Sequence, residues 1–228
     1  MVKVYNGDCL DIMPSLENGS IDLILTDPPY MISRKSNFAN GGGNESKYGS
    51  ITMNFGEWDW GEGIDMEKYF KEAYRLLRNG GTIIMFYDIF KMGTIKDIAE
   101  KVGFKQPRIG FWSKTNAVPI NARINYLSNA REYFISFCKG KKGIFNSYYD
   151  KAVYNYPIVS GKHRIHPTQK PDGLISDLIK IHSNEGAIVL DTFAGSGVVL
   201  KCCKKLNRNC IGIEMDEKYY NECKKIEE

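Results

Sequence analysis

The chain has 228 residues, 43% of them hydrophobic, and this length and composition suit a single domain with one large buried core. A net charge of +4 is too mild by itself to indicate a polyanion partner, and six cysteines without a Cys-x-x-Cys pair indicate neither a zinc site nor a disulfide framework. No leader-like segment opens the chain, and no apolar run approaches the roughly 18 residues of a membrane span. We therefore expect a cytoplasmic protein without a bound metal.

Hydrophobic periodicity predicts strands and helices that alternate along the chain. Strands are expected at 2–6, 21–26, 82–87, 107–113, 132–138, 187–191 and 209–213. Helices are expected at 9–17, 65–78, 91–102, 171–183, 197–206 and 216–226. This alternation predicts an α/β fold with a doubly wound, mostly parallel, seven-stranded sheet. Because no clear helix separates the fourth and fifth strands, we also expect an antiparallel edge strand.

Residues 22–30 read Asp-Leu-Ile-Leu-Thr-Asp-Pro-Pro-Tyr, a buried-strand pattern followed by an acid, two prolines and an aromatic ring. The prolines fix the backbone, so the Asp27 carboxylate and the Pro28 carbonyl can face one point as acceptors for the two N–H groups of an amine. Tyr30 adds a ring face on which a planar heterocycle can stack. Together with Pro29, these residues predict a pocket for a flipped-out base, although a stiff turn closing the strand would also use them.

Residues 188–197 read Ile-Val-Leu-Asp-Thr-Phe-Ala-Gly-Ser-Gly, an apolar strand that ends before two glycines and a helix. Without a Cβ, the glycines let a ligand approach the backbone N–H groups that open the helix. Glu214 ends the next strand, where a carboxylate could bond both hydroxyls of a ribose. A nicotinamide-binding domain is the competing interpretation, but Leu200 stands where its third glycine should fall. Gly195, Gly197 and Glu214 thus predict a nucleotide site at this turn, which also contains Asp191 and Phe193.

These two segments resemble the motifs of the DNA amino-methyltransferases, which methylate the exocyclic amine of adenine or cytosine. Residues 27–30 are similar to the catalytic motif of that family, and residues 193–197 match its Phe-x-Gly-x-Gly motif for S-adenosylmethionine. The amine-binding motif precedes the cofactor glycines, as in the beta class of these enzymes. The resemblance spans nearly the whole chain and implies the S-adenosylmethionine-dependent methyltransferase fold.

The resemblance also implies a cofactor contact just before the helix at 171–183. Residues 166–171 read His-Pro-Thr-Gln-Lys-Pro and are similar to the segment that closes over the methionine end of the cofactor. His166 belongs to this segment, and Lys170 or Thr168 could bind the methionine carboxylate. The prolines could also simply start the helix, and the two interpretations are compatible.

A third cofactor contact is implied near the start of the chain. Gly7-Asp8-Cys9 resembles the segment that contacts the cofactor adenine, with Asp8 accepting a hydrogen bond from the adenine amine. Asp8 could equally end the strand or cap the helix that begins at Cys9. We include Asp8 and Cys9 in the predicted cofactor site.

Basic residues are unevenly distributed along the chain. Residues 101–170 hold 13 Lys or Arg and two acids, Glu132 and Asp150, so this segment carries +11 and the remainder −7. Such asymmetry is expected for a surface that binds a phosphate backbone, although a solvated loop would also carry single clusters. A target-recognition insertion is expected at about 139–165 within the single domain, and a glycine-rich loop at 39–50 could close on DNA or lack a function. The predicted DNA contacts are Arg34, Lys35, Lys114, Arg123, Lys139, Lys141, Lys142 and Arg164.

An aromatic amine is a poor nucleophile, because its lone pair is delocalised into the ring. Asp27 and the Pro28 carbonyl would hold the N–H bonds so that the lone pair points toward the transferred methyl group. In the family resembled, an Asp opening this motif usually goes with adenine and a Ser with cytosine. We therefore interpret the chain as a site-specific DNA adenine-N6 methyltransferase that uses S-adenosylmethionine and acts on double-stranded DNA.

Two alternatives stay open at this point. The first is a cytosine-N4 methyltransferase, and the second, from another class, is a non-catalytic DNA-binding module that retains the fold. A cognate restriction nuclease and a homodimer are possible partners, whereas no membrane association is expected.

Overall fold

A computed structural model describes residues 1–29, 64–117, 129–140, 142–160, 165–166 and 168–227. Two compact units divide the chain, one made of Met1–Pro28 with Asp65–Glu228 and the other of Pro29–Ile64. The fold described below belongs to the first unit. Within the described residues, no helix has the length and apolar character needed to cross a membrane.

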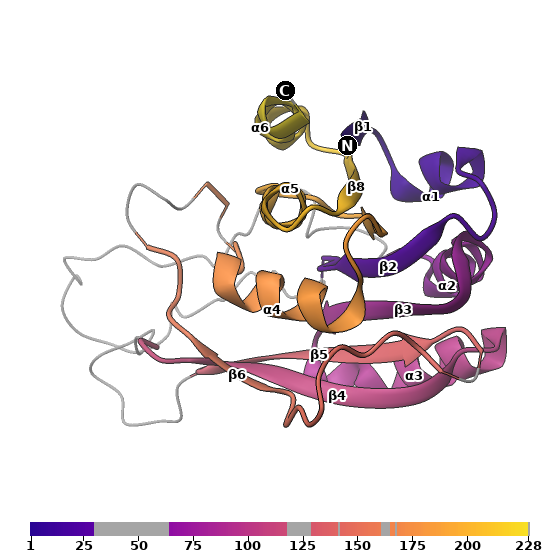
Figure 1. Ribbon diagram of the computed structural model, residues 1–228, viewed down its shortest axis with the longest axis horizontal. Helices are drawn as coiled ribbons and strands as arrows, with labels where there is room; N and C mark the ends of the chain where they lie inside the picture. Colours follow the sequence, from indigo (N-terminus) through magenta and orange to yellow (C-terminus); the bar gives the residue numbers. More distant parts are fainter. Residues whose placement is uncertain (30–63, 118–128, 141, 161–164, 167, 228) are drawn as a thin grey trace, which may run out of the picture. The chain divides into compact units, whose positions relative to one another are not determined.

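An eight-stranded sheet, in the order β1-β8-β7-β2-β3-β5-β4-β6, organises the described residues (Figure 1). Its strands are β1 (Val2–Asn6), β2 (Ile21–Thr26), β3 (Leu77–Tyr87), β4 (Lys105–Lys114), β5 (Arg131–Cys138), β6 (Val153–Tyr156), β7 (Ile188–Asp191) and β8 (Asn209–Glu214). β5 runs antiparallel to both of its neighbours, β3 and β4, and the other neighbouring pairs are parallel. Every residue of the central strand β2 is buried, as expected for a strand covered on both faces.

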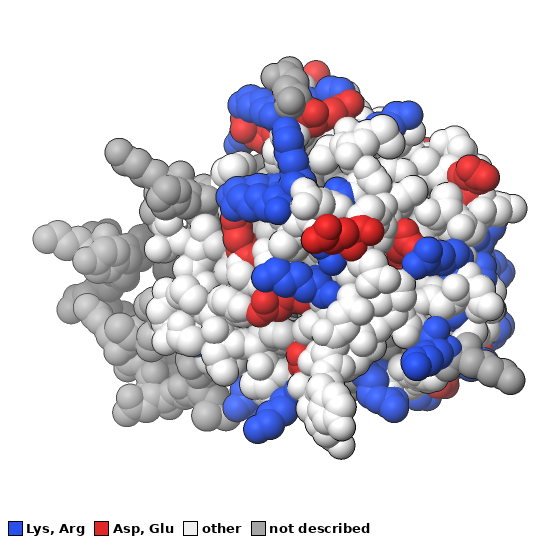
Figure 2. Space-filling view, in the orientation of Figure 1, with Lys and Arg blue, Asp and Glu red and all other residues white. Residues whose placement is uncertain are grey.

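Helices cover the sheet on both faces. They are α1 (Cys9–Ile12), α2 (Met66–Leu76), α3 (Met92–Val102), α4 (Asp172–His182), α5 (Val198–Lys205) and α6 (Glu217–Glu227), with short 3-10 helices η1 (Met13–Ser15) and η3 (Ile89–Lys91). α5 contacts α4 and α6, whereas α2 contacts α1 and α3, so the helices form two groups. Lys, Arg, Asp and Glu side chains are intermixed on the face drawn in Figure 2, where α4 and α5 lie in front. An ion pair of 2.8 Å between Lys201 and Asp172 is typical of this mixed surface.

The predicted α/β fold with a doubly wound, mostly parallel sheet is confirmed, with two corrections to its strands. The sheet has eight strands instead of seven, because the short strand β6 was not predicted. The antiparallel strand is β5, which lies inside the sheet, and β6 takes the edge next to β4. Tertiary contacts fix β6: the Trp112 indole N–H donates to the Tyr156 carbonyl at 2.8 Å, and the backbone N–H of Phe111 donates to Ala152 at 2.9 Å. β6 lies within the predicted insertion at 139–165.

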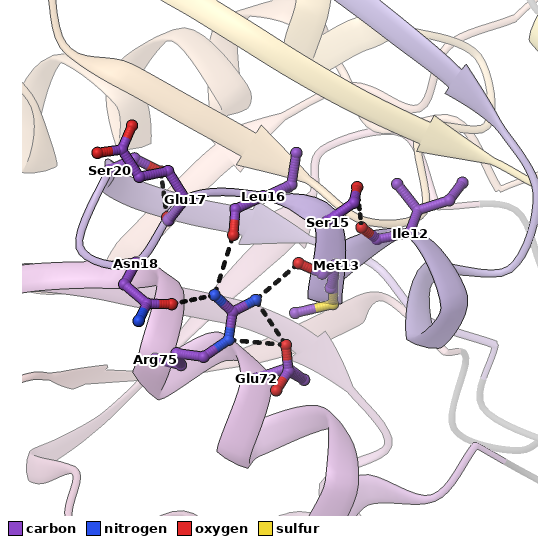
Figure 3. Close-up of polar contacts among 9 residues, drawn as sticks. All are labelled: Ile12, Met13, Ser15, Leu16, Glu17, Asn18, Ser20, Glu72 and Arg75. Atoms are coloured by element: carbon purple, nitrogen blue, oxygen red, sulfur yellow. Dashed lines mark hydrogen bonds and ion pairs between the residues drawn. The ribbon is translucent and has the colours of Figure 1, made fainter.

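Arg75 of α2 holds the connection between η1 and β2 (Figure 3). Its Nη2 donates to the Met13 carbonyl at 2.7 Å and to Glu72 Oε2 at 2.7 Å, and its Nη1 donates to the Leu16 carbonyl at 2.9 Å. Asn18 Oδ1 accepts another hydrogen bond from Nη1. The helix predicted at 9–17 ends early, at Ile12, and the chain continues as a 3-10 turn that begins Met-Pro-Ser. The proline ring removes one backbone donor and favours this break.

Candidate active site

A pocket opens at the carboxyl ends of β2, β3 and β7, the edge at which parallel α/β sheets bind their ligands. It encloses about 450 Å³, part of it open to solvent. Four regions of the chain contribute: the end of β2, the end of β3, the segment before α4 and the turn between β7 and α5. Among the predicted site residues, the pocket brings together Asp27, His166, Thr168, Lys170, Asp191, Phe193 and Gly195.

Asp27 follows the last residue of β2 and is held by a buried lysine. The Lys170 ammonium donates to Asp27 Oδ2 and lies 3.0 Å from Glu132 Oε2. Its side chain is 4% exposed, whereas that of Asp27 is 24% exposed and reaches the pocket. Burial alone would lower the pKa of Lys170, but the carboxylates of Asp27 and Glu132 outweigh this effect and raise it above its ordinary value. Lys170 therefore stays charged and fixes one oxygen of the Asp27 carboxylate.

The other residues of the predicted catalytic motif are only partly described. Pro28 is buried and Pro29 is half-buried, and neither lines the pocket. Tyr30 lies outside the described residues, so its predicted stacking stays a prediction. The glycine-rich loop at 39–50 also lies outside them.

The two glycines between β7 and α5 have different surroundings. Gly195 has φ +49° and lines the pocket, and the nearest atom to an added Cβ would be 3.9 Å away, on the His166 ring. Gly197 has φ +72° and faces α6, where an added Cβ would lie 2.6 Å from Ile226 Cδ1 and 3.2 Å from Cys223 Sγ. Gly195 therefore leaves room for a ligand, whereas Gly197 allows close packing of α6.

Glu214 lies at the end of β8, next to the glycine turn. Its Oε2 accepts a hydrogen bond from the Gly195 N–H at 2.6 Å, and its Oε1 accepts one from the Asp216 N–H at 2.8 Å. Burial raises the pKa of Glu214, and these two N–H groups oppose the rise. Each carboxylate oxygen has a second lone pair, so Glu214 can accept hydroxyl groups in addition.

A buried polar chain supports the floor of the pocket. The Tyr69 hydroxyl lies 2.8 Å from Thr192 Oγ1, which lies 2.9 Å from Thr26 Oγ1, and Thr26 donates to Asp191 Oδ1 at 3.1 Å. The Phe193 N–H also donates to Asp191 Oδ1, at 3.1 Å. Burial raises the pKa of the Asp191 carboxyl to about 7, although these hydrogen bonds oppose it. The pocket thus contains a carboxyl group that titrates near neutral pH.

His166 and Thr168 form one wall of the pocket. His166 Nδ1 lies 3.0 Å from Thr168 Oγ1, and the His166 ring packs edge-on against Tyr219 with centroids 4.5 Å apart. Tyr219 belongs to α6, so this contact connects the segment before α4 with the helix that follows β8. The structure thus brings His166, Thr168 and Lys170 into the pocket that Gly195 also lines, and their contact with a cofactor stays a prediction.

Asp8 and Cys9 lie outside the pocket. Asp8 accepts a hydrogen bond from the Leu10 N–H at 2.7 Å and caps α1, which confirms the capping alternative. The backbone N–H of Gly7 donates to the Glu214 carbonyl at 3.0 Å, so this turn lies beside the end of β8. The Cys9 thiol is buried, and burial with the neighbouring Asp8 raises its pKa to about 12. A contact of Asp8 with a cofactor adenine stays a prediction.

Two of the lysines predicted to bind DNA lie near the start of β3, at the edge of the sheet formed by the opposite ends of the strands from the pocket. The Lys139 ammonium donates to the carbonyls of Tyr74 and Leu77, both at 2.7 Å, where α2 ends and β3 begins. Lys142 lies beside Gly80, because an added Cβ there would be 3.1 Å from the Lys142 carbonyl. The two ends of β3 are roughly 30 Å apart at about 3.3 Å per residue. The prediction for Lys139 is therefore revised: this lysine has a structural role at the far edge.

The remaining predicted DNA contacts fall into two sets. Lys114 lies near the pocket, where its ammonium forms an ion pair of 2.7 Å with Glu132. The others lie outside the described residues and stay predictions: Arg34, Lys35, Arg123, Lys141 and Arg164.

Several functional positions were missed by sequence reasoning. The sequence shows Glu132 only as one of two acids in a basic segment, yet its carboxylate lies between the buried Lys170 and the half-buried Lys114. The pocket is also lined by Thr26, Phe86, Gln169, Ser196 and Val199. Thr26 and Ser196 adjoin the two motifs, so motif position could have identified them. No spacing in the sequence connects Glu132 with Asp27.

Within the described residues, no cluster of three or more His, Cys, Asp or Glu side chains could hold a metal ion.

The site combines a mostly parallel sheet, a glycine turn, an acid on the next strand and an Asp-Pro-Pro segment at one edge. Together these features define a nucleotide-dependent transferase that acts on an amine. The chain belongs to the DNA methylase family, whose model matches residues 21–225. This match confirms the resemblance to DNA amino-methyltransferases and the prediction that the chain is an enzyme.

Similar proteins include two type II methyltransferases. The type II methyltransferase M.HinfI of Haemophilus influenzae is 30% identical over 97% of this chain and 67% of its own length. The type II methyltransferase M2.MboI of Moraxella bovis is 30% identical over 94% of this chain and 83% of its own length. A solved complex of M1.HpyAVI with S-adenosylmethionine superimposes with a TM-score of 0.74 at 27% identity and covers 99% of this chain and 98% of that one. The cofactor bound in this relative is the cofactor predicted from the sequence.

Proposed function

We propose that this chain transfers a methyl group from S-adenosylmethionine to the exocyclic N6 amine of adenine in double-stranded DNA. The observation that carries the proposal is the position of Asp27, whose carboxylate lines the same pocket as the Gly195 turn. S-adenosylmethionine, when bound, supplies an electrophilic methyl group on a sulfonium. The chain must then hold the cofactor and the amine so that the nitrogen attacks the methyl carbon in line.

The residues around the glycine turn fit this cofactor. Gly195 leaves space at the backbone, and Glu214 keeps lone pairs for the two ribose hydroxyls. Thr168 and His166 would hold the methionine end. Lys170, also predicted for that end, bonds Asp27 and Glu132, so Thr168 is the better candidate for the methionine carboxylate. Asp8, Cys9, Asp191 and Phe193 complete the proposed set, whereas Gly197 packs against α6.

Asp27 acts on the target amine. Lys170 bonds Oδ2 and holds the carboxylate, which is proposed to accept one N–H of the amine, and the Pro28 carbonyl is proposed to accept the second. Held in this way, the nitrogen lone pair would be drawn out of conjugation with the ring and would point toward the methyl group; as the nitrogen–methyl bond forms, the sulfur–methyl bond would break and the amine would lose one proton. Tyr30 is proposed to stack on the flipped base. No covalent intermediate with the protein is required.

Adenine is proposed as the target because Asp, rather than Ser, opens the catalytic motif. Cytosine-N4 methylation is the alternative within the family. A non-catalytic module is disfavoured, because Asp27, Gly195 and Glu214 are all present and face or adjoin one pocket. We also propose a target-recognition segment at about 139–165 in a single domain. A cytoplasmic location, a partner nuclease and a homodimer are further proposals that follow from the resemblance.

Asp27→Asn tests the proposal with little change of shape. We expect methyl transfer to DNA to be abolished, because Asn replaces the charged carboxylate and its two oxygen acceptors with a neutral amide. Cofactor affinity should stay within about threefold, which corresponds to less than 1 kcal/mol. Incorporation of radiolabelled methyl groups and calorimetric titration of S-adenosylmethionine measure the two quantities. Near-normal incorporation in a folded Asp27→Asn protein would contradict the role of Asp27.

A further inference from the structure

Glu132 is a half-buried acid that belongs to neither motif of the family resemblance. It is the second residue of β5 and pairs across the sheet with Trp112 of β4. Its Oε2 lies 3.0 Å from Lys170 Nζ, and its Oε1 lies 2.7 Å from Lys114 Nζ. The two lysine side chains are 4% and 13% exposed, respectively. Each oxygen of Glu132 therefore has its own ammonium partner.

These contacts place four charges in a row: Asp27, Lys170, Glu132 and Lys114. The four residues come from β2, the segment before α4, β5 and β4, so the row crosses the pocket edge of the sheet. The signs alternate and the sum is zero. A buried ammonium is costly unless it is paired, so Glu132 helps to keep Lys170 charged and in place. Phe86 also holds Lys170, with its ring centroid 5.0 Å from Nζ.

This arrangement affects Asp27 in two ways. Lys170 fixes the rotamer of the Asp27 carboxylate by bonding Oδ2, one of its two oxygens. An ammonium that belonged to Asp27 alone would also draw electron density from the other oxygen and weaken it as an acceptor. Because Glu132 shares Lys170, part of the ammonium charge is compensated elsewhere. Glu132 thus affects both the position and the acceptor strength of Asp27.

We propose that Glu132 is a positioning residue for methyl transfer, which holds Lys170 and, through Lys170, the Asp27 carboxylate. The proposal rests on the proposed function of Asp27. Glu132 itself does not line the pocket, so it acts through Lys170 rather than on the substrate. Lys114, which could otherwise be assigned to a DNA phosphate, serves as the outer counter-charge of Glu132.

Glu132→Gln removes the charge while keeping the size of the side chain. We expect kcat for methyl transfer to fall by about 10-fold to 100-fold, because a misplacement of about 1 Å at a reacting group has an effect of this order. The KM for DNA and the affinity for S-adenosylmethionine should change less than about threefold, since Glu132 does not line the pocket. Glu132→Asp should recover part of kcat. Single-turnover methylation and calorimetric titration provide these values.

A double-mutant cycle separates positioning from a general structural role. If Glu132 acts through Lys170, Glu132→Gln should cause no further loss of kcat in a Lys170→Met background. An equal loss in both backgrounds would overturn the proposal, as would near-normal kcat in Glu132→Gln. Glu72→Gln is the matched control: its carboxylate pairs with Arg75 at 2.7 Å on α2 and has a similar exposure of 21%. This variant should keep its kcat even where its thermal stability falls.

Two further outcomes keep the proposal distinct from the function on which it rests. If Asp27→Asn is inactive but Glu132→Gln is normal, the positioning role fails and the proposed function stands. If Asp27→Asn is active, the proposed function of Asp27 is wrong, whatever the result for Glu132→Gln. Should Glu132→Gln not fold, judged by circular dichroism and loss of cofactor binding, the folded Glu132→Asp variant decides. Wild-type kcat in Glu132→Asp combined with wild-type kcat in Lys170→Met would overturn the proposal.

Discussion

Asp191 connects the stability of the pocket to pH. Burial raises its pKa to about 7, well above the value of about 4 expected for an unfolded chain. Between these values the native state keeps a proton that the unfolded chain releases, so this residue lowers the free energy of unfolding as pH rises from about 4 to 7. The loss is complete above the folded-state pKa.

Asp191→Asn should remove this pH dependence. The amide oxygen can still accept the hydrogen bonds from Thr26 and the Phe193 N–H. We therefore expect the difference in unfolding free energy, Asn variant minus wild type, to increase from pH 5 to pH 8. Urea unfolding at both pH values measures it. A difference that stays constant or decreases would show that Asp191 is ionised throughout this range.

The two glycines of the turn provide a matched pair for substitution. Both have positive φ, so valine strains the backbone at either position, by about 1–2 kcal/mol or more. Gly195→Val places its side chain in the pocket and should abolish cofactor binding in a protein that still unfolds cooperatively. Gly197→Val places its side chain against Ile226 and Cys223 and should cause the larger loss of thermal stability. Calorimetric titration and thermal unfolding distinguish the two effects, and the reverse pattern would place the cofactor elsewhere.

Among the elements, α2 is connected to the η1–β2 segment by one guanidinium. Arg75→Ala would leave the carbonyls of Met13 and Leu16 without this donor, and we expect a loss of about 2–3 kcal/mol in unfolding free energy. Lys71→Ala on the same helix is the control, because its exposed ion pair with Glu67 is screened by solvent and should contribute little to stability. Chemical denaturation measures both, and equal effects would show that the contacts of Arg75 contribute no more than a surface ion pair.

The sequence predicts an element well when the residues that stabilise it lie close together along the chain. β2 and β7 are apolar strands that end in distinctive polar residues, so both the strands and their position at the pocket could be predicted. β6 has four residues, and it is held by Trp112 of β4 and by α4, where Gly173 leaves room for the Tyr156 ring. These contacts join distant parts of the chain, so no local pattern indicates them. The early end of α1 depends on Pro14 and on Arg75. Only the effect of Pro14 could be predicted from the sequence around the helix.

The same distinction applies to the charged residues. Asp27 and Glu214 could be predicted, because each ends a strand of a known motif. Lys139 and Lys142 look like phosphate ligands in a list of basic residues, but the register of β3 and β5 places them at the far edge. Glu132 looks like an isolated acid, but antiparallel pairing with β4 brings it between two lysines. Charge counts along a segment therefore do not show which edge of a sheet the charges occupy.

For the whole molecule, DNA should lie across the pocket edge of the sheet. Arg131 opens β5 at this edge, and its guanidinium lies 5.2 Å from the Phe111 ring centroid. We expect Arg131→Ala to reduce the slope of log affinity against log salt by about 0.9, the value for one phosphate contact. Lys142→Ala, at the opposite edge, is the control and should leave the slope unchanged. Fluorescence anisotropy at several salt concentrations gives both slopes, and the opposite result would place DNA on the far edge.

Identifying the methylated base tests the central claim most directly. Purified protein is incubated with S-adenosylmethionine and unmodified DNA. The DNA is then digested to nucleosides, which are separated and identified by mass spectrometry, and the Asp27→Asn protein is treated in parallel. The account predicts N6-methyladenine with the wild-type chain and no methylated nucleoside with the variant. N4-methylcytosine, or equal N6-methyladenine from both proteins, would contradict it.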